Sequence, residues 1–171
     1  MILWIAQGFG VGRIPVAPGT FGSVAGIAWA VLLLLPGNLA VFALGTIAGL
    51  ALSVYGCGRA EKILGETDPG SVVLDEIAAL PVCFIPWIAV ASQKLGRFPD
   101  AHHLFSGPNI WWVAGVFAAF RVFDIAKPWP VYGSQKLPGG WGVTTDDFLA
   151  AVYVDLAALL VFALGGWQKL V

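Results

Sequence analysis

The chain has 171 residues, the length of a single domain, and residues 1–171 are treated as one unit. Hydrophobic residues make up 58% of the chain and charged residues 11%, against about 25% charged in ordinary soluble domains. The mean hydropathy is +0.84 and the formal net charge is −1. These values indicate an integral membrane protein and exclude a basic nucleic-acid-binding module, so no nucleic acid partner is expected.

Apolar runs along the chain predict an all-α fold, a polytopic bundle of about five membrane helices. The first two runs, residues 21–35 and 39–55, flank Pro36-Gly37-Asn38, whose turn chemistry predicts a helical hairpin. The remaining runs cover residues 77–91, 110–123 and 148–166. Several runs are shorter than the roughly 20 residues that a helix needs to cross a bilayer squarely, so some are expected to be short or re-entrant. The segments between them, such as 56–71, 94–108 and 127–142, are predicted to be irregular.

The distribution of cations predicts the orientation in the membrane. Five crossings put the segments 1–20, 56–76 and 124–147 on one side. That side receives Arg13, Arg59, Lys62, Arg121, Lys127 and Lys136, whereas the other receives Lys94, Arg97 and Lys169. Because cytoplasmic loops carry the excess of Lys and Arg, the first side is predicted to be cytoplasmic.

Three acidic clusters lie on that same predicted side, each next to an apolar run. They are Asp68 with Asp75-Glu76, then Asp124, then Asp146-Asp147. Carboxylates at a membrane edge are costly to hold there and indicate function, and oxygen ligands of this kind suit Mg²⁺. For Asp146-Asp147 taken alone, N-capping and a favourable interaction with the dipole of the helix that starts at Phe148 explain the pair better than a metal site does. The three clusters together favour a metal site at the bilayer surface.

Arg121, Asp124 and Lys127 recur every three residues, so on a helix they share a face. One interpretation is that Asp124 binds metal while Arg121 and Lys127 bind phosphate oxygens. The other is an ion-pair ladder that stabilises charges at the membrane edge. This stretch alone favours neither.

The sequence lacks the sets of residues used for covalent phosphate transfer. There is no Ser/His/Asp set, no cysteine nucleophile followed by a phosphate-binding arginine, and no D-x-D aspartyl nucleophile. His102-His103 is predicted to lie opposite the acidic clusters, and Asp155, deep in the last apolar run, is assigned a structural role. Hydrolysis by metal-activated water is the chemistry that remains.

Four motifs follow one another along nearly the whole chain. They are Ala17-Pro-Gly-Thr-Phe-Gly-Ser23, Asp68-Pro-Gly-Ser71 through Asp75-Glu76, Phe120-Arg-Val-Phe-Asp-Ile-Ala-Lys-Pro-Trp-Pro130, and Gly139-Gly-Trp-Gly-Val143 through Asp146-Asp147. In this order and spacing they resemble the phosphatidylglycerophosphatase A family of bacterial lipid phosphatases. The resemblance implies a Mg²⁺-dependent, multi-pass enzyme of the bacterial inner membrane with its active site on the cytoplasmic face. Its phospholipid substrate would be phosphatidylglycerophosphate, hydrolysed to phosphatidylglycerol and phosphate.

The clusters and the resemblance together lead to a hypothesis for the site. The expected metal ligands are Asp75, Glu76, Asp124, Asp146 and Asp147. The expected catalytic residues are Asp75, Glu76, Asp124, Arg121 and Lys127, with the two cations neutralising phosphate oxygens. The expected substrate-binding residues are Thr20, Ser23, Asp68, Ser71, Arg121 and Lys127.

Two other function classes compete with hydrolysis. A CDP-alcohol phosphotransferase also uses metal and carboxylates at a membrane surface, but its long D-G-x-x-A-R signature is absent. A metal or ion transporter would carry charges at the middle of broken helices, whereas only Asp155 lies deep in a run. Gly45-x-x-x-Gly49 suits close helix pairing, either within the chain or in a homo-oligomer.

Overall fold

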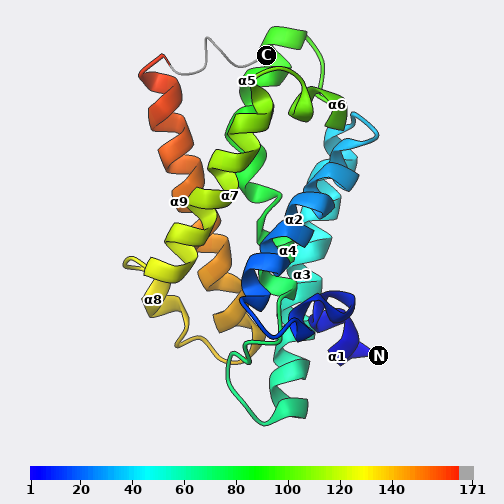
Figure 1. Ribbon diagram of the computed structural model, residues 1–171, viewed down its shortest axis with the longest axis vertical. Helices are drawn as coiled ribbons and strands as arrows, with labels where there is room; N and C mark the ends of the chain where they lie inside the picture. Colours follow the sequence, from blue (N-terminus) through cyan, green and yellow to red (C-terminus); the bar gives the residue numbers. More distant parts are fainter. Residues whose placement is uncertain (166–171) are drawn as a thin grey trace.

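The computed structural model describes residues 1–165, and within that range every regular element is a helix (Figure 1). This confirms the predicted all-α class. The four longest helices are α2 (Pro18–Leu34), α3 (Leu39–Leu64), α7 (Asn109–Ala126) and α9 (Gly140–Ala163). The shorter helices are α1 (Ile2–Ala6), η1 (Gly8–Arg13), α4 (Leu74–Ala79), η2 (Val82–Phe84), α5 (Ile85–Leu95), α6 (Ala101–Phe105) and α8 (Val131–Ser134). Gly166, which ends the fifth predicted run, and Lys169 lie outside the described residues.

Within the described range, three helical units are long and apolar enough to cross a membrane. They are α3, the continuous unit Leu74–Leu95 formed by α4, η2 and α5, and α7. Helix α2 is apolar but shorter. Helix α9 is long enough but carries Asp146, Asp147 and Asp155. The predicted count of about five is therefore approximate.

Two of the predicted boundaries were wrong for identifiable reasons. Helix α3 continues into the first part of the segment 56–71, which was predicted to be irregular, and ends at Leu64; Gly65, with φ of 70°, is its left-handed cap. The run 77–91 is not one regular helix, because Pro81 and Pro86 lack the N–H groups that an uninterrupted helix would use. Short helices also occupy parts of the segments 1–20, 94–108 and 127–142.

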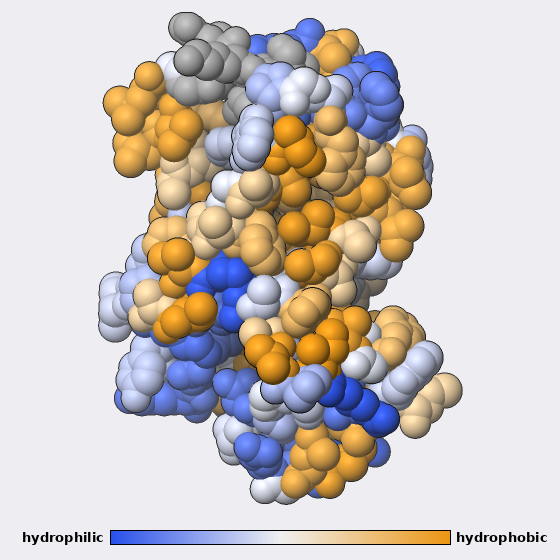
Figure 2. All heavy atoms as spheres, in the orientation of Figure 1, coloured by the Kyte–Doolittle hydropathy of each residue, from blue (hydrophilic) through white to orange (hydrophobic). Residues whose placement is uncertain are grey.

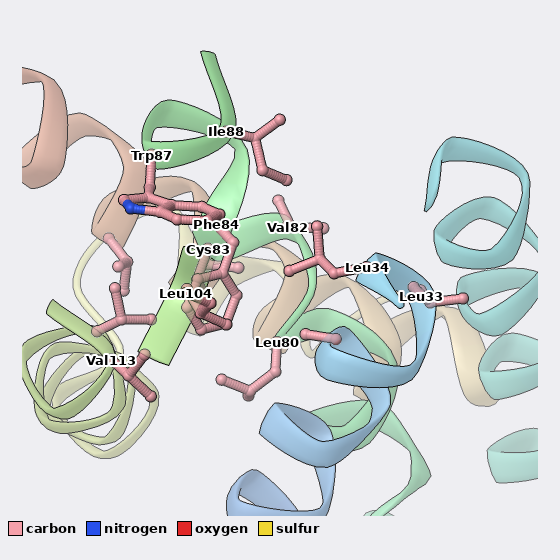
Figure 3. Packing of buried hydrophobic residues seen from close by; sticks show 14 of the residues in the cluster. Leu33, Leu34, Leu80, Val82, Cys83, Phe84, Trp87, Ile88, Leu104 and Val113 are labelled. Carbon is pink, nitrogen blue, oxygen red and sulfur yellow. The ribbon is translucent and has the colours of Figure 1, made fainter. Parts of the chain in front are cut away.

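The bent unit Leu74–Leu95 forms the centre of the bundle. In its apolar 18-residue stretch 72% is buried, against 22% in the corresponding stretch of α3 and 28% in that of α7. Phe84 and Trp87 are fully buried in the main core, where Leu34, Leu80 and Leu104 pack nearby (Figure 3). The Trp87 indole N–H donates to Asn109 Oδ1 over 3.1 Å, so its one polar atom is satisfied. This packing fixes α4, and with it the carboxylates at the start of α4.

Glycines allow close approaches between helices. A Cβ at Gly140, the first residue of α9, would overlap Val54 O and stand 2.6 Å from Gly58 N, so α9 begins directly against α3. Gly45 faces Leu33, and a Cβ at Gly49 would lie 3.3 Å from Trp29 Nε1. The Gly45-x-x-x-Gly49 face therefore packs against α2 of the same chain. Assembly of several copies stays a prediction.

Hydrophobic side chains dominate the outer surface of the bundle. Figure 2 shows orange residues over most of the visible face, with blue residues gathered at its lower left and near its upper edge. Leu44, Ile47 and Leu160 are each more than 60% exposed. Such a surface suits contact with lipid and indicates membrane association.

Candidate active site

The three acidic clusters, which are far apart in the sequence, meet in one pocket of about 290 Å³. It lies where α2 and α4 begin, α7 ends and α9 begins (Figure 1). We call it the acidic pocket; it is lined by Ala17, Pro18, Gly19, Asp68, Gly70, Val72, Asp75, Glu76, Arg121, Asp124, Lys127, Asp146 and Asp147. All five carboxylates expected to bind metal line this pocket, as do both expected phosphate-binding cations.

A tight group of carboxylates lies within the acidic pocket. Asp75, Glu76 and Asp147 each offer one oxygen, and these oxygens all lie within 4.8 Å of one another. Asp75 and Asp147 are buried, and Glu76 Oε2 is a buried oxygen with no hydrogen-bond partner in the described part of the chain. Buried carboxylates of like charge need a compensating cation. The donor set is all oxygen and therefore fits Mg²⁺.

The two adjacent acidic pairs have the same local geometry. Asp75 Oδ1 accepts the N–H of Glu76 over 3.1 Å, and Asp146 Oδ1 accepts the N–H of Asp147 over 3.0 Å. Asp75-Glu76 lies in the first turn of α4, where the first N–H groups have no partner in the helix itself, so Asp75 stabilises that helix start. Asp146-Asp147 instead lies beyond the first turn of α9, which begins at Gly140, so N-capping does not explain this pair.

Arg121 is the cation nearest to Glu76. Its NH1 lies 2.5 Å from Asp124 Oδ2, 3.9 Å from Glu76 Oε1 and 3.4 Å from Ser23 Oγ. Its Nε is buried and has no hydrogen-bond partner within the described residues. Arg121 is thus held by Asp124, as the ladder interpretation expected, while part of its guanidinium remains free to bind an anion.

Lys127 does not continue the ladder on α7. It caps that helix with φ of 42°, in the left-handed region, and its ammonium instead lies 2.6 Å from Asp146 Oδ2 on α9. Gln135 Nε2 also donates to Asp146 Oδ2, over 3.0 Å. Burial by itself would lower the pKa of Lys127, but the hydrogen bond and charge of Asp146 outweigh burial and raise that pKa above its ordinary value. Asp146 is therefore engaged with protein donors rather than grouped with the three clustered carboxylates.

The N-terminus of α2 closes one side of the acidic pocket. A Cβ at Gly19 would overlap Glu76 Oε1 and approach the Arg121 guanidinium to 3.3 Å, so a side chain there would displace Glu76 from its present position. Pro18 occupies the first turn, where its missing N–H costs nothing, and Ala17 before it has φ of 48°. Helix N-termini carry partial positive charge and unpaired N–H groups. This one therefore adds to the positive potential that an anion would meet beside Arg121.

The small hydroxyl residues expected to bind substrate lie at the edge of this arrangement. Ser23 is buried, donates to Gly19 O over 2.9 Å and accepts from Arg121, so it supports that arginine. Ser71 accepts from Gln7 Nε2 over 3.2 Å. Neither Ser71 nor Thr20 is among the residues lining the acidic pocket. Their roles in substrate binding stay predictions.

Sequence reasoning missed Gln135 and Gly19 as site residues. Gln135 lies in a segment predicted to be irregular, and nothing in the sequence pairs it with Asp146. Gly19 could have been found from the sequence, because it lies inside the Ala17 to Ser23 motif. Only the structure shows that its missing side chain makes room for Glu76.

Other polar residues lie outside the acidic pocket. Asp100 caps α6, accepting from the N–H groups of His102 and His103, and its Oδ1 lies 2.7 Å from His103 Nδ1. The hydrogen bond to His103 holds the pKa of Asp100 below its ordinary value. Asp155 Oδ1 is buried without a hydrogen-bond partner in the described part of the chain. None of these residues lines the acidic pocket.

Comparison with known proteins identifies close relatives. The family model described as Phosphatidylglycerophosphatase A matches residues 4–162. Phosphatidylglycerophosphatase A of Haemophilus influenzae is 37% identical, over 96% of this chain and 88% of its own length. The protein of the same name in Escherichia coli is 34% identical, over 86% of this chain and 76% of its own. A Bacteroides thetaiotaomicron protein, provisionally named phosphatidylinositol-3-phosphatase, is 36% identical over 95% of this chain and 92% of its own. No solved structure was found to match this chain.

Proposed function

The chain belongs to the phosphatidylglycerophosphatase A family, and from this premise we propose that it hydrolyses the terminal phosphomonoester of phosphatidylglycerophosphate. The products are phosphatidylglycerol and inorganic phosphate, so the reaction is a step of phospholipid synthesis. The observation that carries the proposal is the group of three carboxylates within 4.8 Å, placed beside a partly unpaired arginine at the end of an apolar bundle.

Asp75, Glu76 and Asp147 are the residues that would hold Mg²⁺. Their oxygens converge, and Glu76 Oε2 has no other partner among the described residues. The metal would supply an activated water and neutralise the transferred phosphoryl group. Asp124 would act by orienting Arg121, with which it forms an ion pair, and Asp146 by orienting Lys127.

Arg121 and the start of α2 would bind the phosphate. Pro18 has no N–H, and the N–H groups of Thr20 and Phe21 donate to Ala17 O. The Gly19 N–H is therefore the donor that the start of α2 would offer, close to Glu76 Oε1 and to the Arg121 guanidinium. Donors fixed in advance stabilise negative charge that develops in the transition state. A phosphomonoester presents three terminal oxygens to such donors, whereas a diester presents two, and this difference favours the terminal phosphate of the lipid.

The proposed location is the bacterial inner membrane, with several crossings and the acidic pocket on the cytoplasmic face. Support comes from the distribution of cations. Arg13, Arg59, Lys62, Arg121, Lys127 and Lys136 belong to the end with the acidic pocket, whereas Lys94 and Arg97 follow the far end of the central unit. Cytoplasmic ends carry such an excess. The acyl chains would stay in lipid while the headgroup enters the pocket.

A second candidate substrate is a phosphoinositide that carries a phosphomonoester on its inositol ring. The Bacteroides relative covers nearly the whole chain at 36% identity, and its name refers to a phosphomonoester on a different polyol headgroup. The chemistry proposed for the acidic pocket is the same for both lipids. The two candidates therefore differ only in what surrounds the phosphate.

Phosphate release by the purified protein in mixed micelles tests the proposal. The substrates are phosphatidylglycerophosphate, phosphatidylinositol 3-phosphate and phosphatidic acid, each with Mg²⁺ or with EDTA. We expect Mg²⁺-dependent release that is fastest from phosphatidylglycerophosphate. Asp147→Asn should lose at least about 100-fold in rate, because it removes a direct metal ligand. Asp155→Asn is the matched control, since it makes the same change two turns along the same helix and outside the acidic pocket. A folded protein that released phosphate from none of the three lipids would overturn the proposal.

A further inference from the structure

A second polar cavity of about 210 Å³ lies beside the acidic pocket. It is enclosed by the end of α3, the segment that follows α3, and the turn that leads into α9. We call it the outer pocket; it is lined by Glu61, Thr67, Asp68, Gln135, Leu137, Gly139, Gly142 and Val143.

The outer pocket and the acidic pocket share a wall. Asp68 lines both cavities. Gln135 lines the outer pocket and donates through Nε2 to Asp146, which lines the acidic pocket. A group attached to a phosphate in the acidic pocket therefore has the outer pocket immediately next to it.

The residues that line the outer pocket differ in charge from those that line the acidic pocket. Its lining contains the carboxylates of Glu61 and Asp68, the Thr67 hydroxyl and the Gln135 amide, and none of the residues that line it is a lysine or arginine. The charge of Lys127, which reaches Asp68 from the acidic pocket, is shared with Asp146, and Glu61 has no lysine or arginine beside it in the lining, so the outer pocket disfavours a second phosphate group. Its two carboxylates favour a neutral donor such as an alcohol hydroxyl, because a hydrogen bond to a charged acceptor is among the stronger ones.

Glu61 is held so that one of its oxygens remains available. Its Oε1 accepts the backbone N–H of Asp68 over 3.0 Å, which fixes the side chain. Its Oε2 lies on the Gly139 side, 3.8 Å from where a Cβ at that residue would stand. Gly139 has φ of 58° and ψ of −146°, a conformation that side chains other than hydrogen disfavour. The absent side chain leaves space next to Oε2.

We propose that the outer pocket binds the hydroxyl-bearing linker between the scissile phosphate and the rest of the lipid, with Glu61 Oε2 accepting the hydroxyl proton. The inference rests on the proposed function, because it assumes that the scissile phosphate occupies the acidic pocket. Glu61 is then a residue that determines specificity. Phosphatidic acid carries its phosphate directly on diacylglycerol and has no such hydroxyl, so it leaves the outer pocket without a ligand.

The test compares kcat/KM for phosphatidylglycerophosphate and for phosphatidic acid in one micelle system with Mg²⁺. In Glu61→Gln the amide oxygen can still accept from Asp68, but an NH₂ group replaces the free acceptor. We expect the ratio of the two kcat/KM values to fall about tenfold, because the hydroxyl then meets a neutral NH₂ group in place of a charged acceptor, and hydrogen bonds to charged groups are the stronger ones. Glu66→Gln is the matched control, because it removes the same charge from an exposed neighbour that does not line the pocket, and it should leave the ratio unchanged.

The outcomes separate the inference from the proposed function. A wild-type protein that cleaves both lipids, with a ratio that Glu61→Gln does not alter, overturns the inference and leaves the phosphatase activity standing. Equal losses toward both lipids in Glu61→Gln also overturn it, since they assign Glu61 only a structural role. A wild-type protein that releases phosphate from neither lipid overturns the proposed function and the inference together. A selective loss toward phosphatidylglycerophosphate supports both.

Discussion

Lys127 Nζ lies 2.6 Å from Asp146 Oδ2, and this contact joins the end of α7 to the start of α9. The two residues are 19 positions apart, and no pattern in the sequence predicts that they pair. Lys127 leaves the α7 face on which Arg121 and Asp124 meet because its backbone turns into the left-handed region. The cation therefore neutralises a buried carboxylate on another helix, and the two walls of the acidic pocket are held together.

Removing this cation should destabilise the fold. Lys127→Met leaves the buried Asp146 carboxylate with two neutral donors, the Gln135 amide and the Asp147 N–H, and no cation. We expect a loss of about 2 kcal/mol, less than for a fully buried pair because Lys127 is partly exposed. The measurement is thermal unfolding in detergent micelles. The double variant with Asp146→Asn should regain most of the loss, because the stranded charge is gone. Additive losses in the double variant would show that the two side chains are not coupled.

Gly19→Ala should reduce activity without unfolding the protein. Its Cβ would overlap Glu76 Oε1 and crowd the Arg121 guanidinium, so the carboxylate must move away from its partners. We expect at least a tenfold fall in kcat, roughly the effect of a misplacement of about 1 Å in a catalytic site. Gly115→Ala is the control, since no atom lies within 4 Å of its added Cβ, and α7 should keep or gain stability. Unchanged phosphate release by Gly19→Ala would show that Glu76 need not occupy its present position.

The sequence predicted the fold class and the convergence of the acidic clusters, because both depend on local patterns. Apolar runs in the sequence predict helices. The acidic residues lie at the ends of these runs, and alternating crossings predict that these ends share one side of the membrane. The pattern could not predict that α3 continues to Leu64, since helix formers such as Ala60, Glu61 and Lys62 also occur in polar loops. It could not predict the Lys127 to Asp146 pairing either, because that contact depends on where α9 crosses α3. Gly140 determines this crossing through a contact that only the tertiary structure contains.

Gly140→Ala should therefore act on stability and on the site together. The added Cβ would overlap Val54 O and stand 2.6 Å from Gly58 N, and both of these are backbone atoms that cannot rotate away. Overpacking of this kind costs about 1 to 3 kcal/mol, and α9 must shift away from α3. Thermal unfolding and phosphate release are measured. We expect a lower midpoint of thermal unfolding and slower phosphate release, because Asp146 and Asp147 move with α9. Gly133→Ala is the control, since its Cβ would meet no atom within 4 Å. Equal midpoints for the two variants would contradict the close crossing.

The pairing of Asp100 with His103 predicts a pH dependence of stability. The pKa of Asp100 is lowered in the folded protein, chiefly by the hydrogen bond from His103, so folding favours the ionised carboxylate. The contribution is therefore present above the unfolded value of about 3.9 and is lost as the pH falls through the lower folded value. We expect Asp100→Asn to be less stable than wild type at pH 6, by under about 1 kcal/mol because the pair is partly exposed at the surface, and equally stable near pH 2. A stability difference that persists at pH 2 would assign the effect to α6 capping alone.

Mg²⁺ should stabilise the folded protein even when no substrate is present. A cation bound by the folded state alone raises stability by RT ln(1 + [Mg²⁺]/Kd), about 2.7 kcal/mol at one hundred times Kd. The expected ligands, Asp75, Glu76 and Asp147, are buried carboxylates whose mutual repulsion the cation would relieve. Thermal unfolding is measured with Mg²⁺ and with EDTA. The midpoint should rise with Mg²⁺ in wild type and in Asp155→Asn, but not in Glu76→Gln or Asp147→Asn. Each of those two should be at least as stable as wild type in EDTA, because it removes one repelling charge without changing size. An equal Mg²⁺ response in all four proteins would place any bound cation away from these carboxylates.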